Sequence, residues 1–306
     1  MPMEPALFAR ILSLAVLCAA IPASAGPVMI TPDERLDHPW MMQCGEWDGW
    51  NKPGPSFQIF DNTYYVGTCG ISSILITGDD GHILIDTGTE KGADLVKANI
   101  EQLGFKLGDI KVILHSHEHH DHVGGMAKMK EWTGAKVLAS TSARKVLETG
   151  NVGPDDPQFG VHPDLAPVTV DEEVWSGKDI VVGNLKVEAI ATPGHTPGAM
   201  SWTWASCHAS VCADIMYADS LSPVSADGYK FGDHPEYLNQ YKLALERLAA
   251  RDCNLLITPH PSASNMFYRM KRVRGLLGEE MCTGYARAIE RRLDARLKHE
   301  TEEASE

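Results

Sequence analysis

The sequence predicts an α/β fold in which sheets are packed together and flanked by helices. Short strand-like segments rich in Ile, Val and Tyr alternate with segments of helical spacing along the chain. The two halves of the chain have a similar make-up, and neither shows a short-period repeat. Elements of this kind bury their apolar faces by stacking in layers, so a sandwich of sheets covered by helices is expected.

The elements follow in order. In the first half, strands are expected at 64–67, 72–77, 82–86, 109–114 and 136–139, and helices at 91–103 and 140–148. A loop rich in Pro, Asp and Gly spans 150–163. In the second half, strands are expected at 180–182, 185–190, 200–204, 211–217 and 254–258, and helices at 235–250 and 286–298. The acidic tail from Glu300 to Glu306 is expected to fray.

The first 25 residues have the pattern of a secretory signal. Arg10 precedes the apolar run 11–21, and Ala23-Ser24-Ala25 resembles a cleavage site. The run is too short to span a bilayer comfortably. We therefore expect export to the periplasm or the medium, with the mature chain, residues 26–306, forming a single domain.

Charge and hydropathy exclude two classes of partner. The formal net charge is −14, which argues against nucleic acid, because phosphate binding favours a basic surface. No later stretch is apolar enough for membrane insertion. We expect a small-molecule substrate and a monomeric chain.

Six cysteines remain once the signal is removed, at positions 44, 69, 207, 212, 253 and 282. An even number in an exported chain indicates disulfides, although six cysteines permit 15 pairings. Cys207 and Cys212 are close enough in sequence to close a hairpin between two strand-like segments.

Histidines are concentrated at one strand end. The segment His115-Ser-His-Glu-His-His-Asp-His122 directly follows the strand 109–114 and contains five of the chain's 13 histidines. Packing gains nothing from crowding imidazoles, and protonated imidazoles repel one another. A metal cation keeps such a cluster neutral, so the segment predicts a metal site.

Two further histidines follow strands in similar loops. His195 lies in Thr-Pro-Gly-His-Thr-Pro-Gly after the strand 185–190, and His260 lies in Thr-Pro-His-Pro after the strand 254–258. Proline stiffens both turns. Three strand ends that carry histidine can converge at one edge of a sheet sandwich, where loops on a rigid scaffold usually hold the chemistry.

These residues resemble the metallo-β-lactamase superfamily, whose His-x-His-x-Asp-His signature is matched by residues 117–122. The segments 64–76, 81–88 and 217–224, with Thr-Pro-His-Pro and the cysteines, resemble class B β-lactamases of subclass B3. The resemblance implies a four-layer αββα sandwich with its active site at one edge of the two sheets. It also implies three disulfides, Cys44–Cys69, Cys207–Cys212 and Cys253–Cys282.

The resemblance further implies two zinc ions and the residues that hold them. His117, His119 and His195 would bind the first ion, and Asp121, His122 and His260 the second. Asp86 would support a ligand histidine, although a turn aspartate explains it about as well. His115 and His120 fall at non-ligand positions, where supporting or solvated residues are expected.

The implied activity is zinc-dependent hydrolysis of the β-lactam amide bond of penicillins, cephalosporins and carbapenems, which gives antibiotic resistance. A metal-bound hydroxide would attack while Asp121 orients it. Ser220 and Ser222 would bind the substrate carboxylate, but ordinary turn serines explain them equally well.

The sequence offers further candidates for contacts around the expected cleft. Tyr229 is a candidate to assist the oxyanion. Gln158 and Phe159 are candidates for the cleft wall. Trp40, Trp47 and Trp50 would either cover the site or pack in the core.

Two alternative functions remain. The first is a related hydrolase of the same fold, a glyoxalase II-like thioesterase or a lactonase, in which Asp219 would bridge two metals. The second is a non-catalytic zinc-binding protein, which the intact set of six ligand positions argues against.

Overall fold

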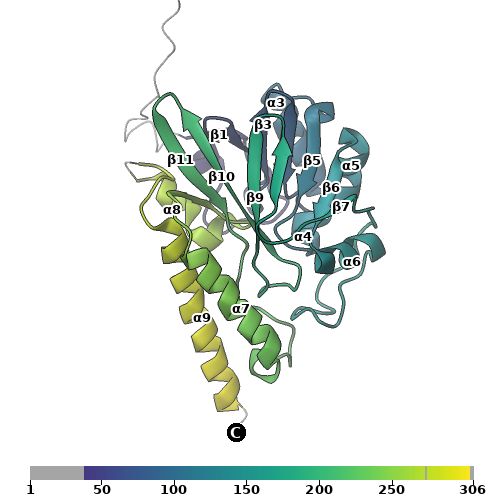
Figure 1. Ribbon diagram of the computed structural model, residues 1–306, viewed down its shortest axis with the longest axis vertical. Coiled ribbons are helices and arrows are strands. Elements are labelled where there is room, and N and C mark those ends of the chain that lie inside the picture. Colours follow the sequence, from purple (N-terminus) through teal and green to yellow (C-terminus); the bar gives the residue numbers. More distant parts are fainter. Residues whose placement is uncertain (1–37, 273, 304–306) are drawn as a thin grey trace, which may run out of the picture.

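A computed structural model describes residues 38–272 and 274–303. The predicted signal segment, residues 1–25, lies outside the described residues. In the described part, two sheets lie face to face with helices on both outer sides (Figure 1). The predicted α/β sandwich of four layers is confirmed.

The first sheet has seven strands in sequential order, from β1 to β7. They are β1 Phe57–Phe60, β2 Thr63–Tyr65, β3 Ile74–Gly78, β4 Gly81–Ile85, β5 Ile110–Leu114, β6 Lys136–Ala139 and β7 Glu172–Glu173. Strands β1 to β4 pair antiparallel, whereas β4 to β7 pair parallel. The parallel register places Ile85 beside Leu114, so the segments that follow β4 and β5 leave the same edge of the sheet.

The second sheet has the order β12-β11-β10-β9-β8. Its strands are β8 Asp179–Val182, β9 Leu185–Ala191, β10 Met200–His208, β11 Val211–Tyr217 and β12 Leu255–Ile257. β10 pairs antiparallel with both β9 and β11, and β11 pairs parallel with β12. The carboxyl ends of β9, β11 and β12 therefore lie at one edge.

Three apolar clusters separate the layers. The central cluster lies between the sheets and includes Trp40, Ile85, Trp202 and Tyr217. The second lies between the first sheet and the helices on its outer side, and the third between the second sheet and its own helices. The helices of the first side are α3 Gly92–Gln102, α5 Met126–Thr133 and α6 Thr141–Thr149, and those of the second are α7 Pro235–Ala249 and α9 Met281–Glu303.

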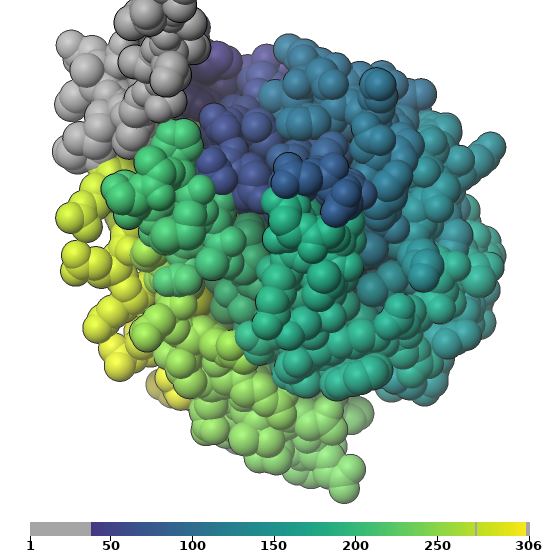
Figure 2. Space-filling view, turned by 45° about the horizontal axis from the view of Figure 1, so that its top comes forward, coloured from purple at the N-terminus to yellow at the C-terminus, as the bar shows by residue number. Residues whose placement is uncertain are grey.

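The two sheets are also joined by polar contacts between β10 and the start of β2. Trp204 donates its indole N–H to the hydroxyl of Thr63 at 3.0 Å, and the hydroxyl of Ser206 donates to the side-chain oxygen of Asn62 at 2.6 Å. In the space-filling view the green β10–β11 hairpin accordingly lies beside the blue strands of the first sheet (Figure 2).

Several short elements were not predicted from the sequence: β1, β7, α5, and the short helices α2 Pro39–Gln43, α4 His120–Val123 and α8 Met266–Met270. The prediction of a frayed tail was wrong for Glu300, which is buried within α9. Its carboxylate accepts hydrogen bonds from the backbone N–H groups of Phe231 and Gly232, both at 3.0 Å.

All three expected disulfides are present, Cys44–Cys69, Cys207–Cys212 and Cys253–Cys282. Cys207 and Cys212 face each other across the β10–β11 hairpin. Among the helices of the described residues, none combines the length and the hydropathy that a membrane span requires.

Candidate metal centre

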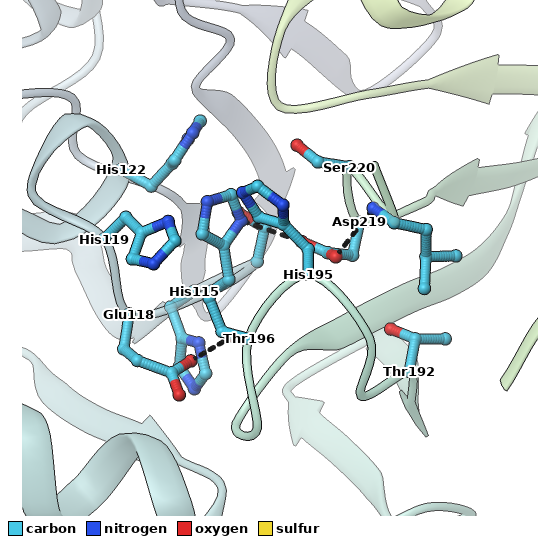
Figure 3. A network of polar contacts seen from close by, with 12 residues as sticks. His115, Glu118, His119, His122, Thr192, His195, Thr196, Asp219 and Ser220 are labelled. Atoms are coloured by element: carbon cyan, nitrogen blue, oxygen red, sulfur yellow. Dashed lines mark hydrogen bonds and ion pairs between the residues drawn. The ribbon is translucent and has the colours of Figure 1, made fainter. Parts of the chain in front are cut away.

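The strand ends of both sheets meet at one edge of the sandwich. β5 leads into the segment 115–122, β9 into the loop that carries His195, β11 into Asp219, and β12 into His260. A backbone hydrogen bond from Ser72 N–H to the Pro259 carbonyl, at 2.7 Å, ties the two sheets together here. Figure 3 shows the imidazoles from these loops gathered around one place.

One group of three candidate ligands is Asp121, His122 and His260. The Oδ2 atom of Asp121 lies 3.1 Å from Nε2 of His122 and 3.3 Å from Nε2 of His260, and these two nitrogens are 3.2 Å apart. A tetrahedral zinc ion with ligands at 2.0–2.1 Å has neighbouring ligand atoms about 3.3 Å apart. The triangle therefore has the size that zinc coordination requires.

The second group is His117, His119 and His195, all of them buried. Each offers a ring nitrogen within 4.8 Å of the other two. The ring centroids lie 4.7–5.0 Å apart and are nearly perpendicular. This trio is wider than the first, but the three rings still face one another from two loops, one of each sheet.

The opposite nitrogen of each ring in this second group is held by an oxygen. Asp219 lies 2.8 Å from Nδ1 of His117, Asp156 lies 3.1 Å from Nε2 of His119, and the Ser222 carbonyl lies 2.9 Å from Nδ1 of His195. An oxygen acceptor fixes the proton on the nitrogen that it contacts and leaves the other nitrogen as a lone-pair donor.

Oxygens also lie near the outer nitrogens of the first group. Nδ1 of His122 lies 3.3 Å from a carboxylate oxygen of Asp86, and Nδ1 of His260 lies 3.3 Å from the carbonyl of Gly70. Asp86 has a φ of 60°, an unusual conformation for aspartate. The backbone N–H and hydroxyl of Ser116 and the hydroxyl of Tyr217 hold it there, at 2.6–2.7 Å.

Burial keeps the second group neutral. Loss of solvent lowers the pKa of His119 and of His195 to about 3, and it lowers the pKa of His117 well below the usual value, with the neighbouring histidines adding to the effect. Neutral imidazole is the form that binds a metal. This group thus presents uncharged nitrogen donors at neutral pH.

An unpaired buried atom provides the test of whether metal fits. Nε2 of His117 is buried and has no hydrogen-bond partner among the described residues. An unpaired buried polar atom is costly unless something else satisfies it. Three imidazoles facing one another, and two imidazoles facing a carboxylate, are donor sets that suit zinc.

The residues expected to bind substrate have different surroundings in the structure. The Gln158 amide is buried and lies 3.3 Å from Nε2 of His195. The Ser220 hydroxyl is buried without a partner, and the Ser222 hydroxyl lies 3.2 Å from Nδ1 of His195. Tyr229 instead stacks on His234, with ring centroids 4.5 Å apart, so it packs at the start of α7.

A cavity of about 280 Å³ opens beside His260. Ser220, Ser222, Trp47 and Trp50 line it, and among its described lining residues Arg292 is the only Lys or Arg. Trp47 and Trp50 are exposed, whereas Trp40 is fully buried in the central cluster. Trp40 therefore packs in the core, whereas Trp47 and Trp50 lie beside the site, so each of the two explanations offered for the tryptophans applies to part of the set.

The structure also identifies residues that the sequence argument did not single out. Asp156, which holds His119, lies in the loop 150–163, and Arg292 comes from α9. Glu118 is buried and accepts hydrogen bonds from the Thr196 hydroxyl at 2.6 Å and the Gly198 N–H at 2.7 Å (Figure 3). Burial, with Asp156 nearby, raises the pKa of Glu118 to about 7.

An αββα sandwich with two such groups at one edge defines a class of metal-dependent enzyme. The chain belongs to the metallo-β-lactamase superfamily, whose sequence model matches residues 66–260. It is 51% identical to MIM-2 metallo-β-lactamase, with a TM-score of 0.83 and coverage of 89% of this chain and 98% of that one.

Two other relatives place the chain within the superfamily. MEM-A1, a subclass B3 metallo-β-lactamase isolated from a soil metagenome library, is 39% identical, with a TM-score of 0.80 and coverage of 83% of this chain and 100% of that one. A hydroxyacylglutathione hydrolase of Bradyrhizobium sp. (strain ORS 278) is 28% identical over 145 residues, 45% of this chain and 48% of that protein. The chain spans about half the length of such curated relatives, and the resemblance to subclass B3 is confirmed.

Proposed function

We propose that this protein hydrolyses the amide bond of β-lactam antibiotics with the help of two zinc ions. The observation that carries the proposal is the pair of ligand groups at the strand ends, in a chain 51% identical to MIM-2 metallo-β-lactamase over nearly the whole of that protein. His117, His119 and His195 would hold one ion. Asp121, His122 and His260 would hold the other.

When bound, zinc lowers the pKa of water to about 7 and polarises a carbonyl group, so a neutral-pH nucleophile becomes available. The chain's own residues orient that chemistry. Asp156, Asp219 and the Ser222 carbonyl fix the rings of the second group, His117, His119 and His195, so their lone pairs point inward. Asp121 is buried between two imidazoles, where its carboxylate can also accept a hydrogen bond from the attacking water.

The cavity beside the ligand groups supports a substrate that carries a carboxylate, as β-lactams do. Ser220 offers a buried, unpaired hydroxyl, and Arg292 offers a positive charge on the same cavity wall. A guanidinium binds a carboxylate through paired N–H donors. We assign Ser220 and Arg292 to the substrate carboxylate, and Gln158 to the opposite side of the site, next to His195.

A thioesterase of the same fold is the second candidate, since curated hydroxyacylglutathione hydrolases resemble this chain. That function was expected to use Asp219 as a bridge between metals. However, one oxygen of Asp219 contacts His117 at 2.8 Å, and the other accepts the Leu221 N–H at 3.0 Å. With both oxygens engaged, Asp219 is better suited to hold His117, which favours the lactamase.

The test is hydrolysis of a carbapenem and of a thioester by the purified chain, each with and without a chelator. We expect carbapenem turnover that the chelator abolishes and added zinc restores. Turnover of the thioester alone would replace this proposal with the second candidate. Zinc binding without turnover of either substrate would leave only a metal-binding function.

The proposal extends to where and in what form the enzyme works. The signal-like segment 1–25 supports export to the periplasm, and the three disulfides suit an oxidising compartment. We propose a monomer that binds two zinc ions. Fractionation of expressing cells and light scattering of the purified chain test these two points.

A further inference from the structure

Two histidines outside both ligand groups lie against each other at the rim of the site. His120 begins the short helix α4, and His162 belongs to the loop between α6 and β7. Their Nδ1 atoms are 3.1 Å apart. Both side chains are partly buried, so this pair lies between the buried ligand groups and the solvent.

Packing fixes the two rings. The His162 ring packs at a tilt against His119 with centroids 4.1 Å apart, and the His120 and Trp50 rings meet in an edge contact with centroids 5.2 Å apart. Neither ring can swing away without losing these contacts. The two Nδ1 atoms are therefore held facing each other.

A third donor lies close to this pair. A carboxylate oxygen of Asp121 lies within 4.8 Å of a ring nitrogen of each histidine. Oδ2 of Asp121 contacts His122 and His260, whereas Oδ1 is buried and has no hydrogen-bond partner among the described residues. The carboxylate of Asp121, 3% of whose surface is exposed, thus has one oxygen left for another ligand.

Two explanations fit a nitrogen–nitrogen distance of 3.1 Å. One is a hydrogen bond, in which one Nδ1 carries a proton and the other accepts it. The other is a shared cation, because ligand nitrogens around one metal ion are separated by about this distance. The unpaired oxygen of Asp121 favours the cation, since a hydrogen bond between the imidazoles would leave that oxygen unsatisfied.

We propose that His120, His162 and Asp121 form a third divalent metal site, at the rim of the active-site cleft. Two imidazoles and a carboxylate suit zinc or copper(II). The site binds more weakly than the two proposed below it, because it shares its carboxylate and is more open to water. The inference goes beyond β-lactam hydrolysis and does not require that activity.

The experiment measures bound zinc over a range of buffered free zinc concentrations, by elemental analysis of the separated protein. The unaltered chain is expected to bind two equivalents first and a third at higher free zinc. His162→Gln and His120→Gln should each stop at two equivalents. His299→Gln, an exposed histidine on α9, is the matched control and should still bind three.

Two results would overturn the proposal: saturation of the unaltered chain at two equivalents, or a third equivalent that persists in either rim variant. Retention of the two tighter ions in both variants shows that they remain folded. Carbapenem hydrolysis measured at the two-equivalent stage reports separately on the proposed function. If the chain does not hydrolyse the carbapenem at that stage but still binds a third equivalent at higher free zinc, the proposed function fails and the rim site stands.

Discussion

At the scale of single residues, the metal centre depends on the partner of each ring rather than on the ligands alone. Every candidate ligand histidine has one nitrogen within 3.3 Å of an oxygen and turns the other toward its group. The oxygens come from carboxylates for three rings and from backbone carbonyls for two. These oxygens determine which nitrogen can bind a metal.

Asp156→Ala should weaken the zinc bound by the second group by about 10- to 100-fold, because His119 loses the carboxylate that orients it. Competition with a coloured chelator measures this affinity. Asp155→Ala, the exposed neighbour in the same loop, is the control and should bind as the unaltered chain does. Equal affinities for the two variants would contradict the role given to Asp156.

Arg292→Ala should raise KM for a carbapenem about fivefold and leave kcat nearly unchanged, because a partly solvated ion pair contributes about 1 kcal/mol to binding. Steady-state kinetics separate the two constants. The control is Arg291→Ala, the exposed preceding residue on α9. A fall in kcat alone would show that Arg292 does not act through ground-state binding.

All six candidate ligands could be proposed from the sequence, since they stand in recognisable motifs directly after strands. Their partners were harder to predict, because they come from distant parts of the chain. Asp219 is 102 residues from His117, and Asp156 is 37 residues from His119. Arg292 stands on a charged helix where nothing local distinguishes it from Arg291; only the packing of α9 brings it to the cavity.

At the scale of elements, parallel pairing is what assembles the site. β4 with β5, and β11 with β12, run in the same direction, so their carboxyl ends deliver polar residues to one edge. Long apolar strands such as β5 and β11 were predictable from composition. Shorter elements were not: β7 has two residues, both glutamate, and it forms only because β6 offers a free edge.

The disulfides should differ in how much each adds to the free energy of unfolding. Cys253–Cys282 closes a loop with a separation of 29 residues, and Cys207–Cys212 closes one of 5. The chain-entropy relation gives about 3.6 and 2.1 kcal/mol for these loops, so replacing the first pair with alanines should cost about 1.5 kcal/mol more. Urea unfolding of the two double variants tests the order. The reverse order would show that native-state effects outweigh loop entropy.

Glu300 should stabilise the end of α9, contrary to the fraying expected from its sequence. Its carboxylate accepts two backbone N–H groups and pairs with Arg296 at 2.6 Å. Glu300→Ala should therefore cost about 1.5–3 kcal/mol of unfolding free energy. Chemical denaturation measures it against Glu303→Ala, an exposed position on the same helix. A loss no larger than that of the control would mean that the last turn contributes nothing.

At the scale of the whole molecule, each proposed zinc ion would connect the two halves of the chain. The first group joins Asp121 and His122 to His260, and the second joins His117 and His119 to His195. The ligands thus come from the carboxyl edges of both sheets. A metal held in this way would act as a clamp across the sandwich, in addition to the apolar cluster between the sheets.

Removal of zinc should therefore lower the stability of the whole fold, and not only that of the loops. At free zinc 1,000 times the dissociation constant, one bound ion adds about 4 kcal/mol to the free energy of unfolding. For a domain of this size that corresponds to a fall in Tm on the order of 10 °C when a chelator is added. Calorimetry with and without the chelator measures it. Magnesium in place of zinc is the control and should restore little, because imidazole-rich sites bind it weakly. An unchanged Tm after zinc removal would mean that the apolar layers alone hold the sheets together, and that the metal serves only the chemistry at their edge.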